Sequence, residues 1–93
     1  MNCKVRIPTP LRRLTGNAAE LSIEAATVGD LVGAIEARHP GFASKILDEK
    51  GQIRRFINIY VNQEDVRFGG GLGTPLKDGD EVSIIPAIAG GAG

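Results

Sequence analysis

TVGDLVGAIEAR, residues 27–38, predicts the main helix of the chain. Thr27 is a typical N-cap, and Asp30, three residues later, approximates the second partner of a capping box and favours the positive end of the helix dipole. The apolar residues at 28, 31, 32 and 35 recur at the spacing of one helical face. Pro40 disfavours helical geometry at the residue before it, so we expect the helix to end near Arg38.

Two segments before this helix alternate between apolar and polar side chains. Residues 2–7 show a period of two, and the alternation resumes in residues 20–24. Pro8 and Pro10 end regular strand pairing, and residues 11–16 are expected to form a turn. The two segments therefore predict an opening β-hairpin.

The segments after the helix also predict strands and turns. The strand at 55–61 places aliphatic residues on one face and Phe56, Asn58 and Tyr60 on the other. Along the chain we expect a short helical turn at 43–47, a strand at 55–61, a turn at 62–65, a short strand at 66–68, a mobile glycine loop at 69–71, a turn at 77–80 and a final strand at 81–86. One helix beside a mixed sheet predicts an α+β fold.

The composition fits one small domain with an aliphatic core. The chain has 93 residues, 42% of them hydrophobic, with three phenylalanines, one tyrosine and no tryptophan. Eleven basic and eleven acidic residues cancel, so the chain lacks the positive charge that nucleic-acid binding needs. No apolar run reaches membrane-spanning length, and the beginning of the chain has no signal-peptide pattern. We therefore predict a cytoplasmic protein that binds neither nucleic acid nor membrane.

Few side chains are placed to carry chemistry. Cys3 is the only cysteine and is expected to be a small buried hydrophobe in the first strand. His39 is the only histidine, and by itself it specifies neither a zinc site nor a catalytic triad. Residues 78–81 lack the spacing of a calcium loop, and the glycines at 69–71 lack the lysine of a phosphate-binding loop. The sequence predicts no catalytic residue, no metal site and no bound cofactor.

The end of the chain consists of small residues. Pro86 is followed by AIAGGAG, residues 87–93. A frayed end is common, but uniformly small side chains also let a backbone bend and pass through a narrow channel. From Pro86 to Gly91 the extended reach is roughly 17 Å, which is enough to carry a carboxylate into another protein's buried site. We therefore predict a domain at 1–86 and a flexible glycine-rich tail at 87–93.

Several segments in combination resemble the MoaD/ThiS family of ubiquitin-like sulfur carriers. The matching stretches are FINIYVN at 56–62, EDVR at 64–67, TPLKDGDEV at 74–82 and IIPAIAGG at 84–91. The resemblance in sequence is close in the second half of the chain. In the first half only the order of the expected strands and helix matches the family. Within the family, NIYVN and EDVRF are most similar to the CysO-like carriers of cysteine biosynthesis. The resemblance implies a ubiquitin-like β-grasp fold, with a mixed sheet of four to five strands packed on one main helix.

The resemblance also implies that the chain is a protein substrate and carrier and not an enzyme. A ubiquitin-activating-type enzyme would use MgATP to adenylate the C-terminal glycine carboxylate, and a sulfur donor would convert it to a thiocarboxylate. A sulfur-accepting synthase would then use the sulfur for cysteine or another sulfur-containing metabolite or cofactor. The carrier would supply a reactive end and a surface that its partners recognise.

The last residues depart from the family pattern in one respect. The pattern implies that Gly91 carries the thiocarboxylate, with Ala89 and Gly90 in the tail behind it. Members of the family usually stop at Gly-Gly, whereas Ala92 and Gly93 follow here. Either a JAMM-type metalloprotease removes these two residues, or Gly93 itself is activated.

Three aromatic residues are the predicted docking site for the adenylating enzyme. Phe56 and Tyr60, with Phe68 nearby, are expected to form an apolar patch on the sheet face that points away from the helix. Two other functions stay open beside the carrier. The same carboxylate could form isopeptide bonds in a ubiquitin-like modifier, or the chain could be the small subunit of a molybdopterin-synthase-type complex.

Overall fold

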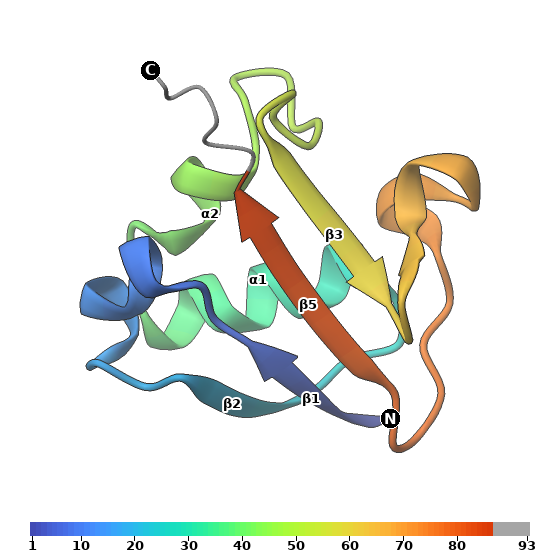
Figure 1. Ribbon diagram of the computed structural model, residues 1–93, viewed down its shortest axis with the longest axis horizontal. Helices are drawn as coiled ribbons and strands as arrows, with labels where there is room; N and C mark the ends of the chain where they lie inside the picture. Colours follow the sequence, from blue (N-terminus) through green and yellow to red (C-terminus); the bar gives the residue numbers. More distant parts are fainter. Residues whose placement is uncertain (87–93) are drawn as a thin grey trace.

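The fold is a five-stranded mixed sheet with the main helix packed on one face (Figure 1). The computed structural model describes residues 1–86. Its strands are β1 (Asn2–Arg6), β2 (Glu20–Glu24), β3 (Ile57–Val61), β4 (Glu64–Asp65) and β5 (Glu81–Pro86). They lie in the order β2-β1-β5-β3-β4, with β5 parallel to β1 and all other neighbours antiparallel. The predicted opening hairpin and the predicted final strand are confirmed.

The main helix α1 (Val28–Arg38) follows the predicted pattern. The Thr27 hydroxyl accepts a hydrogen bond from the backbone N–H of Asp30 at 3.1 Å, which satisfies one of the free donors at the helix start. The apolar face of α1 is buried through Val28, Leu31, Val32 and Ile35. His39 caps the other end, where its backbone N–H donates to the carbonyl of Ile35.

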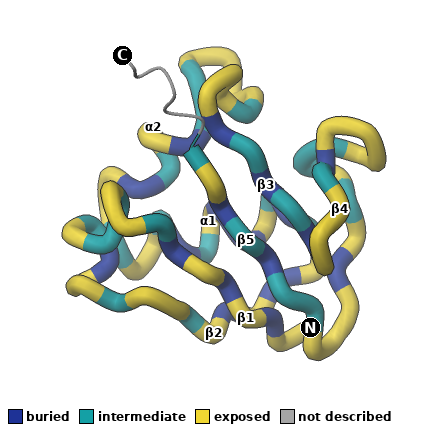
Figure 2. The backbone as a smooth tube through the Cα atoms, in the orientation of Figure 1, coloured by how far each residue is buried: buried dark blue, intermediate teal, exposed yellow. Residues whose placement is uncertain are grey.

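The hydrophobic core lies between α1 and the inner face of the sheet (Figure 2). Burial alternates along β1, β3 and β5 up to Ile84, as expected for strands with one face on a core, and Pro86 at the end of β5 is partly buried. A short helix, α2 (Phe42–Ile46), adds the side chains of Phe42 and Ile46. The core is mainly aliphatic, as predicted, but Phe42 is its largest fully buried side chain.

The segment after β1 differs from the prediction. A 3-10 helix, η1 (Thr9–Thr15), replaces most of the turn expected at 11–16. Pro10 lies at its start, where proline costs no hydrogen bond because the first N–H groups of a helix are free. Gly16 ends it with a φ of 66°, a left-handed conformation that glycine adopts readily.

The hairpin after β3 is tighter than predicted. Strand β4 begins at residue 64, inside the turn expected at 62–65, and a 3-10 helix, η2 (Val66–Phe68), replaces the expected short strand. The reason is a two-residue loop in which Asn62 and Gln63 both have positive φ, at 51° and 76°, as a type I′ turn requires. The Asp65 side chain then caps η2.

A glycine-rich segment that overlaps the mobile loop expected at 69–71 lies against the main helix. It contains a third 3-10 helix, η3 (Gly71–Gly73), whose contacts include α1. A Cβ atom added to Gly29 of α1 would lie only 3.2 Å from the carbonyl oxygen of Leu72. The close approach of these two segments therefore favours glycine at residue 29, because a larger residue would push the Leu72 carbonyl away by a few tenths of an ångström.

Candidate functional site: the outer sheet face and the end of β5

Strand β5 brings the chain through the middle of the sheet to the end of the described region. It lies between β1 and β3, and its last residue, Pro86, pairs with Ile57. The predicted carrier residues Ala89, Gly90, Gly91, Ala92 and Gly93 lie outside the described residues. Their roles, and the division into a domain and a tail, stay predictions. The structure does show the strand that leads to them, which is described up to Pro86.

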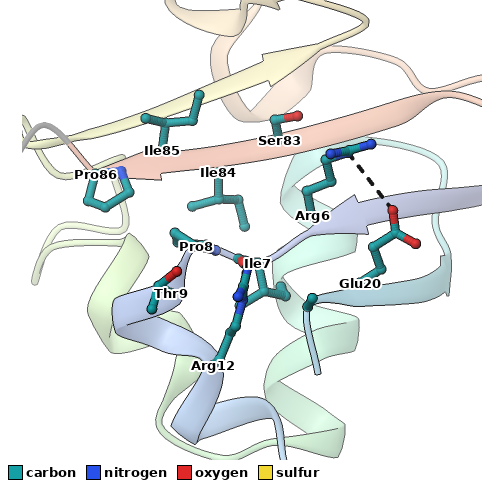
Figure 3. Close-up of a pocket in the computed structure, with 11 residues that line it drawn as sticks. Arg6, Ile7, Pro8, Thr9, Arg12, Glu20, Ser83, Ile84, Ile85 and Pro86 are labelled. Carbon is teal, nitrogen blue, oxygen red and sulfur yellow. Dashed lines mark hydrogen bonds and ion pairs between the residues drawn. The ribbon is translucent and has the colours of Figure 1, made fainter. Parts of the chain in front are cut away.

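A groove opens beside the last residues of β5 (Figure 3). Its volume is about 720 Å³, and its walls come from β1, η1, β5 and the start of β2. Pairing between β1 and β5 stops at Arg6 and Ser83, whereas β5 continues to Pro86. Because Pro8 has no N–H to continue the ladder, the chain turns away there and leaves one side of β5 uncovered. Pro8, Thr9 and Pro86 line the resulting groove.

The charged groups of this groove are already partly paired. The Arg6 guanidinium donates to the Glu81 carboxylate at 2.9 Å and lies 3.9 Å from Glu20. The hydrogen bond and the charge of Glu81 raise the pKa of Arg6 further above its ordinary value. Arg12 donates through Nε to the carbonyl oxygen of Ile7, so its remaining N–H groups are the cationic donors near the groove. The site thus has mixed polar and apolar walls without a strong net charge.

The three aromatic residues of the predicted docking patch are on the surface but on different segments. Phe56 precedes β3 and is 64% exposed, Tyr60 is half-buried within β3, and Phe68 in η2 is 91% exposed. Asn58 lies between Phe56 and Tyr60 along the chain, and its side-chain oxygen accepts a hydrogen bond from Arg67 at 2.7 Å. A polar pair therefore separates the first two aromatic residues, and Phe68 follows the edge strand β4. The docking role stays a prediction for all three.

One exposed apolar residue of this surface was not singled out from the sequence. Ile85 is 48% exposed on β5 and pairs with Asn58, so it lies diagonally from Tyr60. The signal was present, because Val82 and Ile84 point to the core and the residues that alternate with them must point away. Ile85 and Tyr60 form the apolar middle of the outer face, the sheet face turned away from α1.

The described residues contain neither an exposed cysteine nor a cluster of metal-binding side chains. Cys3 is buried, and burial together with the nearby Asp80 raises the pKa of its thiol, which disfavours the nucleophilic thiolate. No group of three or more metal-binding side chains occurs within residues 1–86. In the same range, none of the helices combines the length and apolar character that crossing a membrane requires.

Comparison with known proteins identifies the family. Residues 5–91 match the model described as the ThiS family. The chain belongs to the ThiS family. This ThiS-family chain is 47% identical over 93 residues to the sulfur carrier protein CysO of Mycobacterium tuberculosis, with 98% of this chain and 100% of the relative covered. It is also 38% identical over 66 residues to small archaeal modifier protein 3 of Haloferax volcanii, which covers 71% of each chain.

Solved structures confirm the β-grasp fold of this ThiS-family protein. The crystal structure of M. tuberculosis CysO matches with a TM-score of 0.89 at 45% identity, covering 92% of this chain and 99% of that chain. A chain of the BexX/CysO complex from Amycolatopsis orientalis matches with a TM-score of 0.88 at 45% identity. The match covers 91% of this chain and 94% of that chain. The resemblance to the MoaD/ThiS family, and to CysO within it, is therefore confirmed.

Proposed function

We propose that this ThiS-family chain is a sulfur carrier. Its C-terminal glycine is adenylated by a partner enzyme and converted to a thiocarboxylate, which donates sulfur in the biosynthesis of cysteine or another sulfur-containing metabolite or cofactor. The observation that carries the proposal is the full-length similarity to CysO, a named sulfur carrier, in both sequence and structure. The carrier itself is the substrate of its partners and not an enzyme.

The chemistry explains why the carrier needs no catalytic side chain. A carboxylate is a poor electrophile, so its oxygen first attacks the α-phosphate of ATP, and pyrophosphate leaves. A sulfur donor then displaces AMP from the acyl-adenylate and leaves a terminal thiocarboxylate. The adenylating enzyme binds MgATP and supplies the groups that stabilise these steps.

The geometry supports separate roles for the outer sheet face and for the end of β5. The outer face around Tyr60 and Ile85 offers half-exposed apolar surface for docking, which is typical of the centre of a protein interface. From Pro86, the chain enters the small-residue segment 87–93. An enzyme held on the outer face can therefore receive a carboxylate delivered from the end of the same strand.

Gly91 is the proposed working terminus. The family match ends at residue 91, which supports removal of Ala92 and Gly93 before activation. A JAMM-type metalloprotease is the proposed class of enzyme for this step. The competing proposal is direct activation of Gly93. The two proposals differ in the mass of the sulfur-bearing chain, which ends at Gly91 in the first and at Gly93 in the second.

Reconstitution tests the proposed function. The full chain and a chain ending at Gly91 are incubated with ATP, sulfide and the adenylating enzyme, and intact mass is measured. We expect the shorter chain to gain the mass difference between sulfur and oxygen. Gly90→Val should block this gain in mass, because a branched side chain makes the tail too wide for the narrow channel of the adenylating enzyme. Ala87→Gly keeps the tail small and should retain the gain. No gain in either chain with an active enzyme would refute the proposal.

The same experiment tests the alternative of a protein modifier, which the similarity to small archaeal modifier protein 3 supports. Incubation with host lysate and ATP would then give species of higher mass that are joined through lysine. Conjugates without thiocarboxylate would favour the modifier. A larger subunit that co-purifies stably with the chain would favour a synthase complex.

A further inference from the structure

We propose that the free edge of β2 binds an extended, basic segment of a partner protein, which adds to the sheet as a sixth strand. This site is on the edge strand β2, which β1 separates from β5, although Glu20 at the start of β2 also lines the groove beside the end of β5. It takes no part in the sulfur chemistry proposed above. The proposal combines three observations: the direction of the backbone groups of β2, a groove along its edge and the charge of its exposed side chains.

The backbone groups of three residues of β2 point away from the sheet. The N–H of Ile7 donates to the carbonyl of Ala19, and the N–H of Ala25 donates to the carbonyl of Met1. In an antiparallel pair the bonded residues alternate, so odd-numbered residues of β2 pair with β1. The N–H and C=O groups of Glu20, Ser22 and Glu24 are therefore directed outward, where another strand can bind them.

A groove runs between this edge and the main helix. Its volume is about 600 Å³, and Ser22, Ala34, Ala37 and Arg38 are among the residues that line it. The two alanines leave room beside the strand that larger side chains would fill. An added strand would point every second side chain into this space, so those positions suit small or medium apolar residues.

The edge of β2 is covered only loosely. A terminal nitrogen of Arg38 donates to the carbonyl of Ser22 at 3.4 Å, near the limit for a hydrogen bond. By contrast, Arg67 makes two bonds of 2.7 Å beside β3, to Asn58 and to the carbonyl of Arg54. An incoming strand can replace the single long hydrogen bond between Arg38 and β2 at small cost in free energy. The two short hydrogen bonds of Arg67 beside β3 would be more costly to break.

The charge of β2 selects a basic occupant. Glu20 and Glu24 are exposed on the strand, and only Glu20 has a basic side chain within ion-pair distance, Arg6 at 3.9 Å, among residues 1–86. A second copy pairing antiparallel about Ser22 would place Glu20 opposite Glu24 twice, and like charges directly opposite are destabilising. Lysine or arginine of a partner strand, placed opposite Glu20 and Glu24, would instead form stabilising pairs of opposite charge. Residues 87–93 of this chain contain no lysine or arginine, so they lack the charge that this edge selects.

The test uses a defined probe, the capped peptide Lys-Val-Lys-Val-Lys-Val-Lys, with Glu-Val-Glu-Val-Glu-Val-Glu as the charge-reversed control. Amide exchange and chemical shifts of the isotope-labelled full chain are followed by NMR. Strand addition should slow exchange at the Ser22 and Glu24 amides by about tenfold or more, because these N–H groups become hydrogen-bonded. The acidic peptide should bind about tenfold more weakly or worse.

Two variants make the result specific. Ser22→Pro removes an outward N–H that β1 does not use, and Ala37→Arg fills the groove with a like charge. Both should abolish slowing at Glu24, whereas Gln52→Arg, which adds the same charge elsewhere, should not. Unchanged exchange at Ser22 and Glu24 with the basic peptide would overturn the proposal, as would equal binding of the acidic peptide or of Ala37→Arg. Slowing that depends on protein concentration without peptide would instead assign the edge to a second copy.

Discussion

Replacing Phe42 with alanine should remove a large part of the stability of this domain. Phe42 is fully buried in α2 and is the largest side chain in the core. Truncation of a buried phenylalanine costs about 3–5 kcal/mol, because apolar contacts are lost and a cavity remains. A domain of this size has a total free energy of unfolding of about 5–14 kcal/mol, so the variant should keep between roughly none and four fifths of it.

Phe68→Ala is the matched control, since the same atoms are removed from a side chain that is 91% exposed. We expect a change within about 0.5 kcal/mol for this variant. Urea unfolding followed by circular dichroism gives both free energies, and thermal unfolding should show Phe42→Ala melting at least about 12 °C below the parent.

The comparison of these two variants can refute the described packing. A cost below about 1 kcal/mol for Phe42→Ala would mean that residue 42 is not at the centre of the core. A similar cost for Phe68→Ala would mean that η2 packs its aromatic ring against the domain. Either result would contradict the arrangement on which the outer-face site depends.

Four further predictions concern single positions. Thr27→Ala should cost about 1 kcal/mol in urea unfolding because a helix cap is lost, and Thr27→Ser should restore most of it. Folding lowers the pKa of Asp80 below its ordinary value of 3.8, chiefly because its carboxylate accepts the N–H of Lys77. The Asp80 carboxylate therefore adds to the free energy of unfolding above about pH 4, and this contribution is lost as the pH falls through the pKa of the folded state. Asp80→Asn should make the free energy of unfolding less dependent on pH in this range. Ile85→Glu should weaken binding to the proposed adenylating enzyme, measured by isothermal titration calorimetry, by about tenfold or more. The urea unfolding curve of this variant should stay nearly unchanged. Cys3 should react with iodoacetamide at pH 8 only after denaturation, since burial raises the pKa of its thiol.

The parts of the fold that sequence patterns predicted are those with local causes. The cap at Thr27, the apolar spacing of α1 and the proline after it are all contained within a few turns of chain, so the helix bounds agree with the structure. The same holds for β5, whose alternation is uninterrupted. Local signals of this kind do not depend on how distant segments pack.

The differences arise where local signals were weak or contacts are long-range. A type I′ turn favours Asn or Gly, and Gln63 gives no hint of its positive φ, so the turn was predicted too long. Burial of Phe42 depends on how α2 packs against α1, which no local pattern contains. The hydrogen bond between Arg67 and Asn58 that interrupts the predicted aromatic patch also joins separate segments.

The candidate site was predicted mainly through the family resemblance. Small residues after Pro86 indicated a segment able to enter a narrow channel, but sulfur as its cargo came only from the combination of motifs. Ile85 shows that a surface residue can be overlooked even when strand alternation places it correctly.

The mass of the native protein, isolated from its own host, tests the sulfur-carrier function most directly. We predict a chain that ends at Gly91 and in which sulfur replaces one oxygen of the terminal carboxylate. Alkylation should convert this thiocarboxylate to a thioester, and hydrolysis of the thioester should then release the sulfur and restore the carboxylate. A chain found only with its full sequence to Gly93 and an ordinary carboxylate, under conditions in which the host needs the sulfur product, would contradict it.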